Sequence, residues 1–266
     1  MKSSSQYTED LRLAHIIADA VDRLTLTRFQ KQDFTVETKP DLTPVTEADK
    51  EAEQLVRSQL SRVRTRDAIV GEEFGATGAS PRQWIIDPID GTKNFVRGVP
   101  VWATLIALLD NGKPVVGVVS APALQRRWWA AEGTGAYTGR SLANAKRISV
   151  SDVTNLSDAS FSYSSLSGWK ELGKRDEFIQ LTDDVWRTRA YGDFWSYCMV
   201  AEGAVDFAAE PELALHDMAA LVPIVTEAGG RFTSLDGEEG PFGAHALASN
   251  GHLHDTVLRR IGTSNS

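Results

Sequence analysis

The sequence predicts a layered α/β fold, in which helices cover the faces of sheets. Three observations lead to this prediction: helical spacing of apolar residues near the N-terminus, apolar runs that end in carboxylates, and an antiparallel meander in the middle of the chain. The chain has 266 residues, of which 42% are hydrophobic, enough for one large or two small domains with a sizeable core.

Two amphipathic helices are predicted first. Between Leu11 and Phe29, apolar residues recur every three or four positions, and Thr8 or Asp10 is available as the cap. A second helix is predicted from Thr46 to Val63, where the first four residues resemble a capping box and one apolar stripe follows.

Two short apolar runs are predicted as buried strands, and each ends abruptly in carboxylates. The first is Ala68–Gly71 and the second is Trp84–Asp87. An antiparallel meander follows, with turn signals at residues 110–112 and 121–122. Its strands are Ala103–Leu109, Pro114–Ser120 and Arg127–Ala131, and tight turns are expected at Gly133, Gly135 and Gly139.

The second half of the chain begins near Ser151 and alternates strands with helices. A helix from Asp217 to Ala228 is expected to stop at Gly229. We therefore divide the chain into residues 1–150, an α+β half with most of the candidate metal ligands, and residues 151–266, an α/β half with Asp217 and the specificity residues. The other expected elements of this half are Ala159–Tyr163, Asp176–Thr182, Trp186–Ala190, Asp193–Glu202, Val205–Ala209, Arg231–Leu235, Ala246–Ser249 and a closing helix to Ile261.

Charge and cysteine usage exclude several classes of protein. The net charge of −8 argues against a nucleic-acid or anionic-membrane surface, although metal ions can still bring an anionic substrate to an acidic site. The single cysteine, Cys198, excludes an intrachain disulfide and a thiolate metal site, and fits a reducing cytoplasm. No signal-peptide pattern or membrane-length apolar stretch is present, so we expect a cytoplasmic protein.

The segment from Asp87 to Thr92 is the most informative acidic signal. Pro88 fixes φ between Asp87 and Asp90, and Gly91 permits a sharp turn, so hard oxygen donors point at one centre. Such ligands suit Mg²⁺, Mn²⁺ or Ca²⁺ rather than zinc. An EF-hand calcium loop is excluded because the required glycine and glutamate positions do not match. The residues after Gly91 can begin a short helix whose free N–H groups face an anion.

Together with three other acidic segments, this one resembles the signatures of the inositol monophosphatase superfamily. Residues 84–95 (WIIDPIDGTKNF) are similar to its motif W-I-x-D-P-[IL]-D-G-T-x-N-F. Residues 216–220 and 227–230 are similar to W-D-x-A-A…E-A-G-G, and residues 45–49 and 71–73 are similar to V-T-x-A-D and G-E-E. Four matches in the same order cover most of the chain, so the resemblance is specific.

The resemblance implies an α/β/α/β/α sandwich, usually dimeric, with two or three Mg²⁺ ions per site and Mn²⁺ as an alternative cofactor. Asp87 would be shared between two ions, and Asp49 would lie close to a weaker third ion near Glu72. Backbone N–H groups of Gly91 and Thr92 would contact the phosphate. The implied metal ligands are Glu72, Asp87, the Ile89 carbonyl, Asp90 and Asp217.

The chemistry agrees with this cluster. Phosphate-ester hydrolysis is among the slowest uncatalysed reactions, so it needs large charge stabilisation. Metal ions about 4 Å apart can activate water and stabilise the leaving alkoxide. We infer that such a water is the nucleophile, oriented by Glu72 and the Thr92 hydroxyl, and that no covalent enzyme intermediate forms. Asp49 is counted with the catalytic residues, although the capping box also gives it a structural role.

The chain departs from the family pattern at two positions. His216 replaces the common tryptophan before Asp217, and it either packs in place of the indole or faces the substrate or a neighbouring carboxylate. Lys93 stands where threonine is frequent, and it either reaches the phosphate or remains solvated.

Two acidic residues, Asp193 and Glu210, indicate which substrate the protein prefers. Asp193 precedes a helix at a position where inositol-preferring relatives carry small residues, and Glu210 matches the acid that contacts the organic part of the substrate. Two acids beside the leaving group favour a cation. Asp193 has the alternative role of capping its helix. The Gly-Asp-Phe segment at 192–194 looks like the histidinol-phosphate phosphatase branch, in which the substrate is an amino alcohol phosphate.

The sequence therefore predicts a Mg²⁺-dependent phosphomonoesterase that hydrolyses histidinol phosphate in histidine biosynthesis. An inositol 1-phosphate or broad sugar-phosphate phosphatase is the alternative. A non-catalytic binding protein with the same fold is a third hypothesis, disfavoured because every expected ligand is present. The expected partner is a small phosphorylated metabolite, with no nucleic acid and no membrane, and the protein is expected to be a homodimer.

Overall fold

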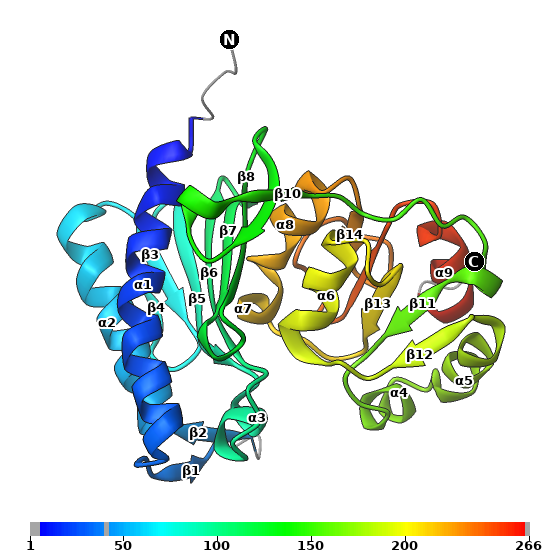
Figure 1. Ribbon diagram of the computed structural model, residues 1–266, viewed down its shortest axis with the longest axis horizontal. Coiled ribbons are helices and arrows are strands. Elements are labelled where there is room, and N and C mark those ends of the chain that lie inside the picture. The colour runs from blue at the N-terminus through cyan, green and yellow to red at the C-terminus, as the bar shows by residue number, and fades with distance from the viewer. Residues whose placement is uncertain (1–5, 40–42, 264–266) are drawn as a thin grey trace.

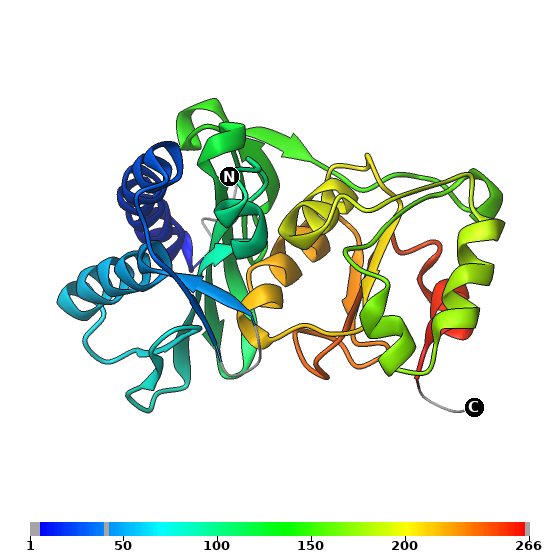
Figure 2. The same ribbon diagram turned by 90° about the horizontal axis from the view of Figure 1, so that it is seen from below.

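The computed structural model describes residues 6–39 and 43–263, and residues 1–5, 40–42 and 264–266 lie outside the description. Helices and sheets stack in five layers along the long axis of the molecule (Figure 1). Helices α1 (Thr8–Lys31) and α2 (Glu47–Val63) cover the outer face of the larger sheet, and a middle helix layer separates this sheet from the smaller one (Figure 2). The predicted α/β/α/β/α sandwich is confirmed.

The larger sheet has eight strands among the described residues, in the order β10-β9-β8-β7-β6-β5-β3-β4. Strands β3 and β5 are parallel, so the carboxyl ends of both runs predicted to deliver acids lie at one edge region. The neighbouring pairs from β5 to β10 are antiparallel, which confirms the predicted meander. The strands are β3 (Ala68–Gly71), β4 (Gly75–Thr77), β5 (Arg82–Asp90), β6 (Ala103–Asp110), β7 (Lys113–Ala121), β8 (Arg126–Ala131), β9 (Gly135–Gly139) and β10 (Lys146–Ile148).

The smaller sheet has the order β12-β11-β13-β15-β14, with β11 parallel to both of its neighbours. The middle helices pack between the sheets: α8 contacts β7 and β8 on one side and β14 on the other. The strands are β11 (Ser160–Ser162), β12 (Arg187–Arg189), β13 (Phe207–Glu210), β14 (Arg231–Thr233) and β15 (Ala246–Ser249), and the helices are α4 (Ser167–Glu171), α5 (Arg175–Asp184), α6 (Asp193–Ala201), α7 (Leu215–Met218), α8 (Leu221–Glu227) and α9 (His254–Ile261).

The two N-terminal helices differ in how well their caps were predicted. The capping box of α2 is confirmed, because the Thr46 hydroxyl accepts from the Asp49 N–H and the Asp49 carboxylate accepts from the Thr46 N–H at 2.8 Å. The predicted cap of α1 is wrong: Tyr7 is the N-cap residue, and its side chain makes no capping hydrogen bond. Asp10 instead binds the side chains of Arg64 and Arg82.

The single helix expected at Asp217–Ala228 is also wrong. It consists of α7 and α8, separated by Ala219 and Ala220. Pro223 has no N–H to donate to the Ala219 carbonyl, so the hydrogen-bond ladder is interrupted at this point. The predicted stop at Gly229 is confirmed: its φ is 96°, and the N–H of Gly230 donates to the Val225 carbonyl as in a Schellman motif.

Several short elements had no sequence signal. The hairpin of β1 (Val36–Thr38) and β2 (Pro44–Thr46), strand β4 and helix α4 are only three to five residues long. Such segments are too short to show a period of 2 or 3.6, and contacts with neighbouring elements determine them.

One core runs through both halves of the chain. It joins buried residues of β5 to β9 to those of α6, α8 and the smaller sheet, and it includes Cys198, whose thiol is fully buried. The sheets divide near residue 150, since β10 ends at Ile148 and β11 begins at Ser160. The division into residues 1–150 and 151–266 stays a prediction. Among the described helices, none combines the length and apolarity needed to cross a membrane.

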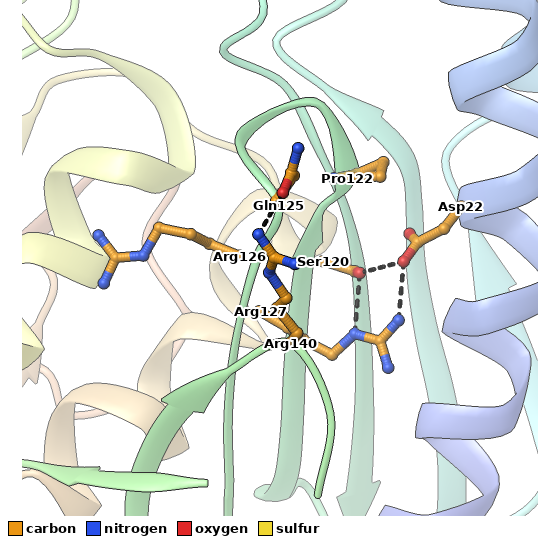
Figure 3. A pocket seen from close by; sticks show the side chains of 7 residues that line it. All are labelled: Asp22, Ser120, Pro122, Gln125, Arg126, Arg127 and Arg140. Carbon is orange, nitrogen blue, oxygen red and sulfur yellow. Dashed lines mark hydrogen bonds and ion pairs between the residues drawn. The ribbon is translucent and has the colours of Figure 1, made fainter. Parts of the chain in front are cut away.

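Arg127 ties α1 to the larger sheet (Figure 3). Its guanidinium is buried on β8 and donates to Asp22 and Asp19 of α1 and to the hydroxyl of Ser120 on β7, at 2.7 to 2.9 Å. His15 contacts the same guanidinium at 3.1 Å. Burial, followed by the charge of Arg127, lowers the pKa of His15 to about 4, so this imidazole is neutral at physiological pH.

Replacing Arg127 by methionine is expected to destabilise the protein by about 2–3 kcal/mol, because the half-buried Asp22 would lose its cationic partner. For a chain of this size that corresponds to a melting temperature roughly 5–8 °C lower. Arg140→Met is the matched control, since Arg140 lines the same hollow but is exposed. Equal melting temperatures for both variants, measured by calorimetry, would contradict this role of Arg127.

Candidate active site

A cavity of about 790 Å³ lies where the ends of β3, β5, β11 and β13 meet α6 and α7. Carboxylates dominate its polar wall, and they come from both halves of the chain. Among the described residues that line it, the ionisable ones are Lys39, Glu72, Asp87, Asp90, Lys93, Asp193, Tyr197, Glu210, Glu212, His216 and Asp217.

A bulge in β5 brings Asp87 and Asp90 into the cavity together. Asp87 pairs with Leu105 and Asp90 with Ala103, so two residues of β5 lie opposite the single residue Thr104. Residues three apart on a regular strand point to opposite faces, and the bulge resets this alternation. Both carboxylates therefore line the same cavity, as the sequence predicted.

Glu72 lies on the turn that follows β3, and a buried acid from α2 holds this turn. The carboxylate of Glu53 accepts the N–H groups of Glu73 at 2.7 Å and Phe74 at 3.2 Å. A side chain at Gly71 would lie 2.0 Å from the Glu53 carboxylate, so glycine is required there. Glu53 thus positions the Glu72 segment although it does not line the cavity.

Lys39 provides positive charge at the same turn. Its ammonium donates to Glu72 and to Glu73, at 2.6 Å in each case. Burial alone would lower the pKa of Lys39, but the two hydrogen bonds outweigh it and raise the pKa. Burial also raises the pKa of Glu73 to about 7.

Asp49 and Thr92 form a hydrogen-bonded pair beside the cluster. The Thr92 hydroxyl lies 3.2 Å from Asp49 Oδ1 and 2.9 Å from the Ile89 carbonyl, while Thr46 holds the other Asp49 oxygen. Asp49 is fully buried, and this burial raises its pKa to about 6 despite the hydrogen bonds from Thr46. A carboxylate with such a pKa can exchange a proton near neutral pH.

The carboxylates in the cavity lie close enough to one another to bind a cation together. Ligand atoms of Asp87, Asp90 and Asp217 lie within 4.8 Å of one another, and so do those of Glu72, Asp87 and His216. Burial raises the pKa of Asp87 well above its usual range, and the charges of Glu72, Asp90 and Asp217 add to this effect. The Oδ1 atom of Asp87 is buried and receives no hydrogen bond from the described residues. A divalent cation fits this donor set, because it supplies both the missing partner and the missing positive charge.

Asp90 also connects the cluster to α6. Its Oδ2 accepts the N–H of Phe194 at 2.7 Å, at the N-terminus of the helix. The alternative role of Asp193 as a helix cap is wrong: Gly192 is the N-cap residue, and the carboxylate that accepts the Phe194 N–H belongs to Asp90 and not to Asp193. Asp193 has a φ of 48°, and its carboxylate accepts a 3.0 Å hydrogen bond from the amide of Asn94.

Glu210 lies on β13 next to this carboxylate in the cavity wall. Burial raises the pKa of Glu210 to about 8, with smaller contributions from the charges of Asp193 and Asp217. Its Oε1 is buried without a hydrogen-bond partner among the described residues. Burial likewise raises the pKa of Asp193 to about 6, and the charge of Asp217 adds to it. Two carboxylates in such surroundings would gain from a cationic ligand.

The structure brings all the predicted site residues to this region and adds others. At the first departure from the family pattern, His216 faces the carboxylates of Glu72 and Asp217. Lys93 is exposed at the cavity wall. Sequence reasoning missed Lys39, Glu53 and Asn94. Glu53 had a signal, because it lies four residues after Asp49 on the buried face of α2.

Comparisons with known proteins place this arrangement in a family. The model of the inositol monophosphatase family matches residues 6–265. The chain belongs to the inositol monophosphatase family. A solved structure of the Thermotoga maritima IMPase has a TM-score of 0.84 at 32% identity, covering 95% of this chain and 96% of the other. The extragenic suppressor protein suhB from Bartonella henselae has a TM-score of 0.86 at 28% identity, covering 97% and 100%.

Two relatives within the family are much closer in sequence. A histidinol-phosphatase from Streptomyces coelicolor is 66% identical over 95% of this chain and 96% of its own length. A histidinol-phosphatase from Mycobacterium tuberculosis is 62% identical over 95% of this chain and 98% of its own. The resemblance inferred from the motifs is thus confirmed as family membership.

Proposed function

We propose that this inositol monophosphatase family member hydrolyses histidinol phosphate to histidinol and phosphate. The observation that carries the substrate choice is a pair of carboxylates, the half-buried Asp193 and the buried Glu210, in the same cavity as the metal-binding cluster. A phosphate ester at the cluster would place a cationic amine or imidazole beside these acids. The high identity to two histidinol-phosphatases supports the same choice.

Mg²⁺ fits the cluster, with two or three ions as the proposed number and Mn²⁺ as an alternative. The ions would supply charge neutralisation and activation of water for attack on phosphorus. Asp87 would serve two ions, because it belongs to both groups of converging ligand atoms. The proposed ligands are Glu72, Asp87, the Ile89 carbonyl, Asp90 and Asp217.

The residues beside the metal-binding cluster are proposed to bind the phosphate and to accept the proton of the attacking water. Gly91 has a φ of 86°, and a side chain there would lie 3.0 Å from the Val101 carbonyl, so the position favours glycine. Because glycine has no side chain, the backbone can approach a phosphate closely at this point. The Gly91 N–H and that of Thr92 are the proposed phosphate contacts. The Thr92 hydroxyl and Glu72 orient the attacking water, and Asp49 receives its proton through Thr92, which already bonds to it.

A neutral substrate is the second candidate. A relative from Aquifex aeolicus, named fructose-1,6-bisphosphatase/inositol-1-monophosphatase, is 34% identical over 97% of this chain. The two candidates differ in the charge of the alcohol, and the acids at 193 and 210 favour the cation. Phosphate release should be measured with histidinol phosphate, inositol 1-phosphate, fructose 1,6-bisphosphate and adenosine 3′,5′-bisphosphate.

With Mg²⁺, kcat/KM for histidinol phosphate is expected to exceed that for each other substrate by about 100-fold, a difference of roughly 2.7 kcal/mol. Removal of the metal with a chelator is expected to abolish turnover of all four. Comparable turnover of inositol 1-phosphate would favour the second candidate. No Mg²⁺-dependent release from any ester would instead favour a non-catalytic binding protein.

We also propose a homodimer in the cytoplasm. The dimer rests on the family resemblance, and the compartment rests on the single buried cysteine and on the biosynthetic role of the proposed reaction.

A further inference from the structure

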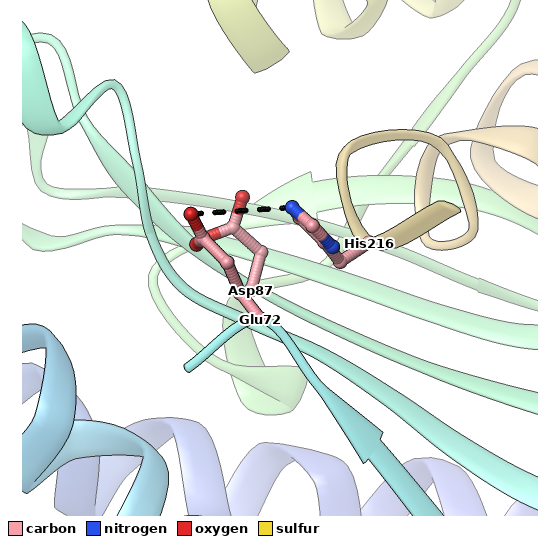
Figure 4. Close-up of side chains that lie close together, drawn as sticks. All are labelled: Glu72, Asp87 and His216. Atoms are coloured by element: carbon pink, nitrogen blue, oxygen red, sulfur yellow. Dashed lines mark ion pairs between the residues drawn. The ribbon is translucent and has the colours of Figure 1, made fainter. Parts of the chain in front are cut away.

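The imidazole of His216 faces the metal-binding cluster (Figure 4). His216 lies on α7, directly before Asp217, and its side chain is one-quarter exposed. Its Nε2 is 4.0 Å from Glu72 Oε1 and 3.6 Å from Asp217 Oδ1. Both distances are too long for a direct hydrogen bond, so the ring points at the carboxylates without binding either.

The distances from His216 Nε2 to the two carboxylate oxygens are close to the distances between ligand atoms that bind one metal ion. With metal–ligand bonds of about 2.1 Å, neighbouring ligand atoms on one ion are roughly 3–4 Å apart. The ligand atoms of Glu72, Asp87 and His216 all lie within 4.8 Å of one another. Lys39 donates to the same Glu72 oxygen, so an ion here would compete with its ammonium.

A second observation points to a ligand at this position. Asp87 is 2% exposed, and its Oδ1 has no hydrogen-bond partner among the described residues. A buried carboxylate oxygen without a donor is costly, and a bound cation removes the cost. Imidazole nitrogen is a common metal ligand, whereas the indole that the family motif has at this position is only a donor.

We propose that His216 is a nitrogen ligand of a divalent cation held with Glu72 and Asp87. The inference rests on the proposed metal-dependent function and deepens it. All-oxygen sites suit Mg²⁺, whereas an imidazole ligand favours transition ions over Mg²⁺. The protein therefore binds Mn²⁺ more tightly, relative to Mg²⁺, than a relative with tryptophan at this position.

The test uses Mn²⁺ alone as the probe on tag-free protein. Pulsed electron paramagnetic resonance of bound Mn²⁺ is expected to show coupling to an imidazole ¹⁴N nucleus in the wild type. His216→Gln and His216→Trp are expected to lose the coupling. His252→Gln is the matched control and is expected to keep it, because His252 is exposed and does not line the cavity.

Calorimetric titration adds a second readout. His216→Gln is expected to weaken Mn²⁺ binding by roughly tenfold or more, in line with the loss of a metal-supporting residue, and Mg²⁺ binding by much less. Absence of ¹⁴N coupling in wild-type protein with bound Mn²⁺, or equal losses for both ions, overturns the proposal even if phosphate release is normal. Coupling without turnover of any ester would instead overturn the proposed function alone. Failure of Mn²⁺ and Mg²⁺ to bind would overturn both.

Discussion

Replacing Asp87 by asparagine is expected to lower kcat/KM for phosphate release by about 10⁴-fold or more, roughly 5.5 kcal/mol of transition-state stabilisation. Asp87 belongs to both groups of converging ligand atoms, so its loss would affect both proposed ion positions. Asparagine keeps one oxygen and the shape of the side chain but removes the charge. Phosphate release at saturating Mg²⁺, compared with Asp183→Asn on the exposed face of α5, measures the effect.

The same substitution should stabilise the metal-free protein. The pKa of Asp87 lies above its usual range in the folded state, so its ionisation costs folding free energy at neutral pH. Removing that charge among Glu72, Asp90 and Asp217 is expected to raise the melting temperature without metal and to remove most of the increase that Mg²⁺ gives the wild type. Wild-type turnover, or an unchanged response of the melting temperature to Mg²⁺, would contradict the assignment of Asp87.

Local patterns were sufficient to predict which segments carry the site. The run at β5 ends in Asp87 and Asp90 with proline and glycine at the turn, and the capping box at α2 identified Asp49 within a helix start. Each of these signals depends on neighbours in sequence, through backbone conformation or a helical first turn. The layered fold followed from the patterns of helices and strands, and the family resemblance followed from four acidic segments in order.

The remaining features depend on contacts that sequence spacing does not encode. The bulge that aligns Asp87 with Asp90 arises from pairing with β6. The break between α7 and α8 is different, because Pro223 is a local signal for it, although α8 also packs tightly on the sheet. Gly117 shows how tight this packing is, because a side chain there would lie 2.1 Å from the Ala220 carbonyl. Acids on helices are usually solvated, whereas Glu53 is buried with the Arg57 guanidinium of its own helix and two backbone N–H groups of the Glu72 turn as partners.

The sequence also offered two roles for Asp193, and the structure favours one. A capping carboxylate would accept an N–H of its own helix, but Asp90 accepts from Phe194 instead. Asp193 is held by Asn94 in a left-handed backbone conformation that is unfavourable for a residue with a side chain. Backbone strain of this kind is concentrated at functional sites, which agrees with a role in ligand contact.

Asp193→Asn is therefore expected to separate cationic from neutral substrates. For histidinol phosphate, kcat/KM is expected to fall by about 10³-fold, roughly 4 kcal/mol, because the substrate cation would lose a half-buried carboxylate partner. For inositol 1-phosphate the loss is expected to stay within about fivefold, since a neutral hydroxyl can bond to an amide as well as to a carboxylate. The asparagine keeps the oxygen that accepts from Asn94, so the fold of the α6 N-terminus should persist.

Glu212→Gln is the matched control, because Glu212 lines the same cavity but is exposed. The substitution removes the same amount of charge from the cavity wall as Asp193→Asn. Solvent screening should limit the decrease in kcat/KM to roughly threefold for either substrate. Steady-state kinetics of both variants on both substrates then distinguishes a half-buried partner of the cation from a general effect of negative charge. Equal losses on the two substrates for Asp193→Asn, or equal losses for the two variants, would show that the selectivity for a cationic alcohol does not originate at Asp193.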